Sequence, residues 1–293
     1  MRPVAADHAN SGLAYYPYGS TGSRKDMRIH HGIDIVNPIG VEIRAVGSGT
    51  VVWAGRGHFN RYEGITSYGN TVVIQHEFGY DGDSVYTLYA HMSAILVDAG
   101  AHVEAGDTIG LIGATGQVSG PHVHFEVRLG RNSYYAVRNP TLWLAPYVGT
   151  GVIAGRVVFP SGDPAEDLEV RMINLETGDF VDRTVTYAGF GVSPDDNWNE
   201  NFAIADVPTG TYLVMTSFGA GRWTAEVTVR EGMTNWAEME LQTTAPLTPE
   251  PSTTPIPSPE GLPLPPLQSA LRLLYFPYGN KGADDIRRVR TAA

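Results

Sequence analysis

The stretch that decides the fold is GPHVHFEVR, residues 120–128. Read with a period of two residues, its polar side chains share one face of an extended strand: His122, His124, Glu126 and Arg128. The apolar residues between them point to the opposite face, which predicts a strand packed against a core. Two imidazoles on one face can bind a single metal ion, or one can bind it while the other transfers protons. A surface strand that carries two histidines by coincidence is the alternative that this stretch alone leaves open.

Composition favours an all-β protein with more than one core. The chain has 293 residues, 42% of them hydrophobic, and 34 glycines and 20 prolines separate short apolar runs that are rich in β-branched and aromatic residues. A formal net charge of -11 argues against a nucleic-acid partner. Because the chain has no cysteine, it can form neither a disulfide framework nor a thiol nucleophile.

We expect no membrane span, because no apolar run is long enough to cross a bilayer. The N-terminal Met1-Arg2-Pro3 is not followed by the apolar segment of a signal peptide. Either an export signal was removed or mis-assigned, or the protein stays inside the cell.

Composition shifts divide the chain into five predicted parts: a polar tail (1–14), a strand-rich first unit (15–147), a second unit (151–242), a linker (243–268) and a short tail (269–293). In the second unit, apolar and polar residues alternate in 154–159, 168–172 and 224–229, which predicts a small antiparallel β-sandwich. The linker is rich in Pro, Thr and Ser and favours extended polyproline II. The last 25 residues, 269–293, are too few to fold alone.

A weak internal repeat relates the two ends of the chain. Tyr15-Tyr16-Pro17-Tyr18-Gly19 matches Tyr275-Phe276-Pro277-Tyr278-Gly279 at a constant offset. The repeat is either a chance aromatic turn or the start of another module.

In the first unit, strands are predicted over 41–46, 50–55, 70–76 and 84–91. The last two flank a polar, glycine-containing turn over 79–83 and should form a hairpin.

The nine histidines all lie at or before His124. His30 and Asp34 stand four residues apart across Gly32, which would let the backbone bend so that an imidazole and a carboxylate converge. Together with His124 they make three ligands and leave a fourth position open for water, the arrangement of a catalytic zinc site. Zinc lowers the pKa of bound water from ~15.7 to about 7.

Two further histidines, His91 and His122, are then available as a general base and as donors to a developing oxyanion. The remaining histidines are interpreted as solvated or structural. His8, His58 and His102 occupy polar surroundings, and His76 ends an apolar strand.

Taken together, His30-x-Gly-x-Asp34, Tyr89-Ala-His91 and His122-x-His124-Phe-Glu126 resemble the lysostaphin/LytM-type zinc metallopeptidases, which cut peptide bonds in bacterial peptidoglycan. The likeness covers roughly residues 27–145. It implies an antiparallel β-sheet metallopeptidase with one zinc ion on His30, Asp34 and His124, and with His91 and His122 catalytic. His31 does not fit the His-x-Gly-x-Asp spacing and is expected not to be a ligand. Glu126 is expected to contact a ligand or to be structural, and not to bind the metal itself. Members of this family usually have an aromatic-Gly-x-Arg sequence before the first ligand, and here residues 18–24 (YGSTGSR) stand in its place.

The segment NFAIADVPTGTY, residues 201–212, is similar to carboxypeptidase regulatory-like (prealbumin-like) β-sandwiches. This resemblance implies that the second unit acts as a spacer, presents the first unit to its substrate, or binds the cell wall or its glycan weakly. Trp198, Trp223 and Trp236 could stack on sugar, but packing is the more ordinary role of large aromatics.

The sequence therefore predicts a zinc endopeptidase that acts on a peptidoglycan stem peptide or cross-bridge, in the extracellular space or the cell envelope. A non-catalytic wall-binding or regulator protein on the same fold is the alternative. A lipoyl or biotinyl carrier domain is excluded, because its cofactor is attached to a lysine and no lysine lies between Lys25 and Lys281.

Overall fold

The computed structural model describes residues 1–22, 27–57, 67–189 and 191–242. The predicted linker and C-terminal tail, the second copy of the repeat and His58 lie outside the described residues. Within the described part, regular structure is strand apart from one short 3-10 helix, η1 (Pro140–Leu142), which confirms the all-β prediction. No helix in that part has the length and apolar character that a membrane crossing requires.

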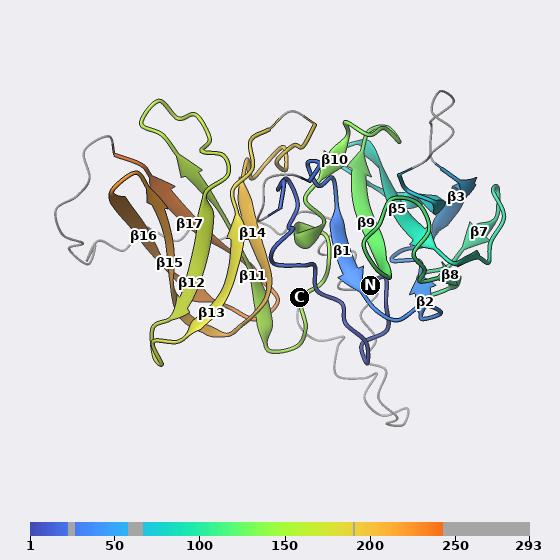
Figure 1. The fold of residues 1–293 in the computed structure, drawn as a ribbon, viewed down its shortest axis with the longest axis horizontal. Helices are drawn as coiled ribbons and strands as arrows, with labels where there is room; N and C mark the ends of the chain where they lie inside the picture. Colours follow the sequence, from blue (N-terminus) through green and yellow to red (C-terminus); the bar gives the residue numbers. More distant parts are fainter. Residues whose placement is uncertain (23–26, 58–66, 190, 243–293) are drawn as a thin grey trace.

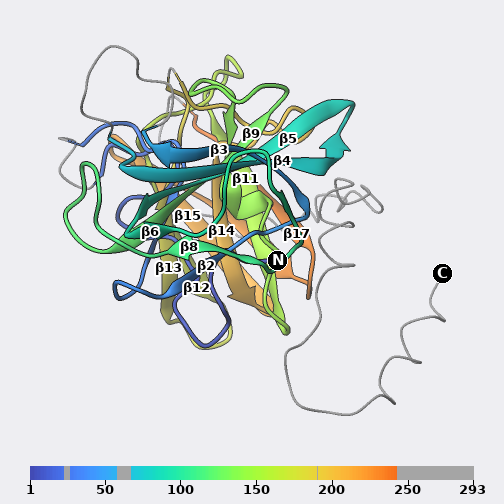
Figure 2. The same cartoon turned by 90° about the vertical axis from the view of Figure 1, so that its right-hand side faces the viewer.

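One large antiparallel sheet organises the first unit (Figure 1). Its seven strands are, in spatial order, β1 (Ile33–Val36), β9 (His122–Leu129), β5 (Asp83–Met92), β4 (Asn70–Tyr80), β3 (Gly49–Arg56) and β7 (His102–Val103), with β10 (Val137–Arg138) also paired to β9. A three-stranded sheet lies beneath β3, β4 and β5 as a second layer (Figure 2). It consists of β2 (Glu42–Arg44), β8 (Thr108–Leu111) and β6 (Ala94–Ile95).

Strand β9 sits between β1 and β5, and all eight of its residues are buried. Its apolar face joins the main core, which it shares with β1, β4 and the second layer; its members there are Val123, Phe125, Val127 and Leu129. The polar face that the alternation predicts is buried too. Its imidazoles and charges must therefore find partners inside the protein.

The hairpin predicted from the 79–83 turn is confirmed. Tyr80 pairs with Asp83, and the two turn residues Asp81 and Gly82 have φ angles of 50° and 89°. Positive φ at both central positions is the geometry of a type I′ turn, whose twist matches that of the flanking strands. The turn fixes the register of β5, which ends next to the functional site.

Two further sheets build the second unit. One contains β14 (Phe202–Pro208), β11 (Thr150–Val158) and β17 (Thr234–Glu240), and the other β13 (Phe180–Val185), β12 (Glu169–Asn174), β15 (Gly210–Phe218) and β16 (Gly221–Val229). Apolar residues from both sheets form one core. The expected antiparallel pairing holds except between β11 and β17, which are parallel.

The two units are packed against each other. The main core continues from the first unit through η1 to Val152 and Ala154 on β11 and Ala203 on β14. A smaller apolar cluster joins Tyr18 and Val137 of the first unit to Tyr187 and Val192 of the second. Polar contacts add to this junction, among them an ion pair between Arg2 and Asp206.

A buried carboxyl group, Glu200, lies close to this junction and is 1% exposed. It accepts hydrogen bonds from the Tyr187 hydroxyl (2.5 Å) and from the Asp195 backbone N–H (3.0 Å). Burial raises the pKa of Glu200 to about 7, although these hydrogen bonds oppose the shift.

We therefore predict that Glu200 makes folding stability depend on pH. The folded state holds this proton with a pKa of about 7 and the unfolded chain with one near 4.5. The raised pKa contributes about 3 kcal/mol to the free energy of unfolding below pH 4.5, and this contribution is lost as the pH rises through 7. The amide side chain of the variant Glu200→Gln stays neutral at every pH, so the variant should not lose this stability. In urea titrations, the free energy of unfolding of Glu200→Gln minus that of the wild type should increase by about 3 kcal/mol between pH 4.5 and pH 8.

The exposed Glu176→Gln is the control and should follow the wild type at every pH. Parallel pH profiles for wild type and Glu200→Gln would contradict the prediction.

Candidate functional site

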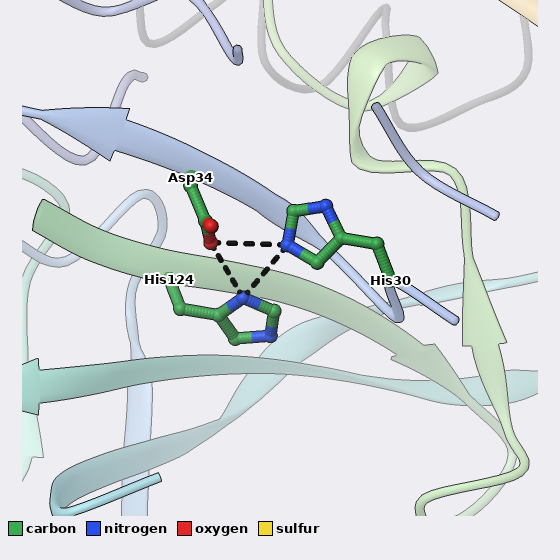
Figure 3. A group of neighbouring side chains, drawn as sticks. All are labelled: His30, Asp34 and His124. Atoms are coloured by element: carbon green, nitrogen blue, oxygen red, sulfur yellow. Dashed lines mark hydrogen bonds and ion pairs between the residues drawn. The ribbon is translucent and has the colours of Figure 1, made fainter. Parts of the chain in front are cut away.

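The three predicted ligands meet at the buried polar face of β9. Asp34 on β1 lies directly opposite His124 in the β1–β9 pairing, so both side chains project from the same face. His30 precedes β1 and turns its ring toward them (Figure 3). His30 Nε2 and His124 Nδ1 lie 3.0 Å and 2.8 Å from Asp34 Oδ1, and 3.1 Å from each other.

Gly32 lies between His30 and Asp34 and is needed for a reason that the sequence did not reveal. The expected bend is present at residues 31–32, although Gly32 is not among the glycines with positive φ. A β-carbon at Gly32 would lie 2.9 Å from the His124 ring and 3.0 Å from the Glu126 side chain, and would overlap the Phe125 carbonyl. The glycine therefore permits the ligand loop to cross β9 closely.

Hydrogen bonds on the far side of each ring determine which nitrogen faces the cluster. His30 Nδ1 donates to the Tyr16 carbonyl at 2.8 Å, and His124 Nε2 donates to the Glu126 carboxylate at 3.0 Å. Both acceptors lack a proton, so we assign the proton to the outer nitrogen in each case. When a metal ion displaces the proton between His124 and Asp34, the lone pairs of His30 Nε2 and His124 Nδ1 would face that ion, as in histidines that bind metals.

Glu126 is fully buried and links His124 to two other side chains. Arg128 Nε donates to it at 2.7 Å and the Tyr68 hydroxyl at 2.5 Å. Burial alone would raise the pKa of Glu126, but the Arg128 guanidinium and His124 hold it well below its usual range. A permanent carboxylate thus fixes the orientation of the His124 ring.

The cluster also controls the charge of its own members. Burial would raise the pKa of Asp34, but His30 and His124 hold it far below its usual range. Burial would lower the pKa of His124, but hydrogen bonds to Asp34 and Glu126 raise it to about 9. The pair therefore holds a proton between His124 and Asp34 at neutral pH, in the place that a cation would take.

The donor set fits zinc. Two imidazole nitrogens and one carboxylate oxygen are ordinary zinc ligands. Ligand atoms at about 2.0–2.1 Å from a tetrahedral zinc are about 3.3 Å apart, so the present separations of 2.8–3.1 Å need only a small outward movement. His30, Asp34 and His124 could hold one metal ion, with a fourth position left for water or substrate.

Two more imidazoles flank the cluster. The rings of His91 and His122 are 4.7 Å apart, and His122 Nε2 lies 3.5 Å from Asp34 Oδ1. Their Nδ1 atoms donate to backbone carbonyls, of Thr115 and Gly120 respectively, each at 2.9 Å. Burial lowers the pKa of His91 to about 3 and lowers that of His122 as well. Both rings are therefore neutral at pH 7 and can accept a proton at Nε2.

The other described histidines lie outside the cluster. His31 is buried against the Tyr134 ring, at 3.9 Å between centroids. His76 is buried and bonded to Thr87, while His102 is exposed and paired with Glu77. His8 pairs with the adjacent Asp7 near the surface. These positions agree with the structural or solvated roles expected for them.

Sequence reasoning missed the residues that orient the ligands. Tyr16 stacks on His30 with 4.0 Å between centroids and an angle of 6° between planes, and no motif connects the two. Tyr68 contacts Glu126 from a loop between β3 and β4, and no sequence pattern links it to β9. The period-two pattern did place Arg128 beside Glu126, and that parity was the signal for their ion pair.

Comparison with known proteins identifies the first unit. The sequence profile of peptidase family M23 matches residues 28–136, which include the four histidines and the aspartate of the site. Residues 28–136 are a peptidase family M23 domain. DD-carboxypeptidase/endopeptidase Mpg of Neisseria meningitidis serogroup B is 41% identical over 102 residues, and Peptidoglycan DD-endopeptidase ShyA of Vibrio cholerae is 43% identical over 103 residues. Each match covers 35% of this chain and 20% or 21% of the relative.

Lysostaphin of Staphylococcus staphylolyticus is 32% identical over 147 residues, which is 50% of this chain and 27% of the relative. The chain thus spans about a fifth to a quarter of the curated relatives that it matches. Among solved structures, the catalytic domain of lysostaphin from Staphylococcus simulans is 29% identical with a TM-score of 0.37, covering 45% of this chain and 89% of that one.

We predict that Glu126→Gln weakens zinc binding by the M23 domain about tenfold, because the His124 ring loses its anionic acceptor. The substitution also leaves Arg128 buried without its counter-charge and should lower the free energy of unfolding by about 3 kcal/mol. Zinc affinity is measured by chelator competition at a temperature where the variant is folded.

Glu77→Gln is the matched control, because it breaks a Glu–His pair on the surface, with His102. It should leave zinc affinity unchanged. Wild-type affinity in folded Glu126→Gln would show that the carboxylate does not act on the ligand.

Proposed function

We propose that this protein is a zinc-dependent endopeptidase that hydrolyses peptide bonds in bacterial cell-wall peptidoglycan. The observation that carries the proposal is the buried His30–Asp34–His124 cluster with two neutral imidazoles beside it. The names of the relatives support the same reaction, since Mpg and ShyA are named as endopeptidases.

In this proposal the three ligands hold one zinc ion, which when bound acidifies water and polarises a carbonyl group. His91 and His122 handle the protons. With Nδ1 committed to a backbone carbonyl, each ring keeps Nε2 as an acceptor, and His122 Nε2 lies 3.5 Å from Asp34 Oδ1. One imidazole takes the proton of the attacking water and, once protonated, gives it to the departing amine. The other stays neutral and accepts a hydrogen bond at Nε2 from the attacking water, which orients that water for attack.

The backbone holds His91 in an unusual conformation. Its φ angle is 64°, a value that few non-glycine residues adopt. The strand β5 ends here, and the His91 N–H donates to the Tyr68 carbonyl at 2.8 Å. Such strain at an element terminus is frequent where a side chain must be aimed at a reacting group.

The substrate in this proposal is the stem peptide or the cross-bridge, and the place of action is the extracellular space or the envelope, where peptidoglycan lies. The complete set of ligands and flanking histidines favours catalysis over a purely wall-binding role. Glycan binding by the second unit stays a prediction. Trp223 is buried in that unit's core, and Trp236 packs against the main core.

We predict that His30→Ala abolishes zinc binding and hydrolysis together, because it removes one of three protein ligands. His122→Ala should keep one zinc per chain and lose turnover by about 10²–10⁴-fold, since only proton transfer is removed. Metal content by elemental analysis and release of muropeptides by mass spectrometry test both variants.

The surface variant His102→Ala is the control and should match the wild type in both measurements. Undiminished hydrolysis by His122→Ala would refute the role given to that residue. Stoichiometric zinc with no cleavage of any defined peptidoglycan by the wild type would refute the function.

A further inference from the structure

His30 is held in place by a short irregular segment that precedes it, residues 16–20. The Gly19 N–H donates to the His30 carbonyl at 2.8 Å, and the His30 N–H donates to the Ser20 carbonyl at 3.0 Å. The Tyr16 carbonyl accepts from His30 Nδ1, and the Tyr16 ring stacks on the imidazole. Backbone position, tautomer and ring plane of His30 thus all depend on residues 16–20.

The second unit covers the other side of this segment. The Tyr187 ring meets the Tyr18 ring edge-on, with 5.0 Å between centroids and 90° between planes. Gly19 lies so close to the Tyr187 Cβ that no side chain fits there, and its φ is 77°. The Tyr18 hydroxyl donates to the Ser193 carbonyl at 3.0 Å and accepts from the Ser193 N–H at 2.9 Å.

Tyr187 is itself rigidly held. It is 2% exposed, and its hydroxyl donates to Glu200 at 2.5 Å and accepts from Asn139 at 3.3 Å. Its backbone N–H donates to the Asn201 carbonyl at 2.8 Å. A ring fixed at both ends is a firm support for the glycine that it touches.

We infer that Tyr187 is a positioning residue for the metal centre: through Gly19 it fixes the backbone of His30, and the second unit is a structural part of the site. The inference rests on the proposed zinc role of His30. The second unit then lowers the cost of ordering a ligand before the metal binds, which raises metal affinity in the way that supporting contacts do.

The test is the zinc dissociation constant of the full chain, measured by chelator competition, together with the free energy of unfolding of the zinc-free protein. Tyr187→Leu removes the ring that meets Tyr18 edge-on, which loosens the segment that contains Gly19, and should weaken zinc binding about tenfold. Tyr187→Phe keeps the ring and should stay within about twofold of the wild type. Tyr18→Phe, a milder change that removes only the hydroxyl bonded to Ser193 and to the Val137 carbonyl, should weaken binding about threefold.

Tyr212→Leu is the matched control, because Tyr212 is equally buried in the second unit's core but belongs to a different apolar cluster from Tyr18. It should lower stability and leave zinc affinity unchanged. Wild-type affinity in folded Tyr187→Leu and in Tyr18→Phe would overturn the inference, as would an equal loss in Tyr212→Leu. A wild-type protein that binds no zinc would instead refute the proposed function, so the two failures are distinguishable.

Discussion

Strand β9 buries four polar side chains on one face, and this constraint governs the arrangement around it. An imidazole, a carboxylate or a guanidinium removed from water costs several kcal/mol unless its polar atoms are paired. The partners therefore come from every direction. Arg128 neutralises Glu126, Tyr68 adds a donor, and Asp34 arrives from the neighbouring strand. The metal-binding cluster is one end of a network that the protein needs in order to bury this face at all.

The same network separates two histidines that stand two residues apart. His124 turns Nε2 toward Glu126 and Nδ1 toward Asp34, so both nitrogens are engaged and its pKa rises to about 9. His122 places Nδ1 on the Gly120 carbonyl, and burial lowers its pKa. One ring is therefore prepared to be a ligand and the other to accept a proton. The acceptor beyond each ring makes the difference, because the strand gives both residues the same face.

Local patterns carry most of what can be predicted from this sequence. Period-two alternation locates β9, the polar turn locates the β4–β5 hairpin, and the spacing of His30 and Asp34 brings them to His124. Contacts between distant segments leave no such pattern. Tyr18 and Tyr187 are far apart in the chain, and nothing in either stretch encodes the other. The parallel pairing of β11 with β17 and the close approach at Gly32 are likewise tertiary facts, decided when sheets and loops pack.

The continuous core between the units affects how this protein can be recombined with others. Chimeric enzymes are commonly made by cutting between a catalytic part and the part that follows it. Here a cut near residue 148 would uncover Val152, Ala154 and Ala203, which now lie in the same apolar cluster as the M23 strands. The exposed apolar surface would drive aggregation of both fragments. The transferable piece therefore extends at least to Leu241, the last buried residue of the described chain, and a new partner is best joined after it.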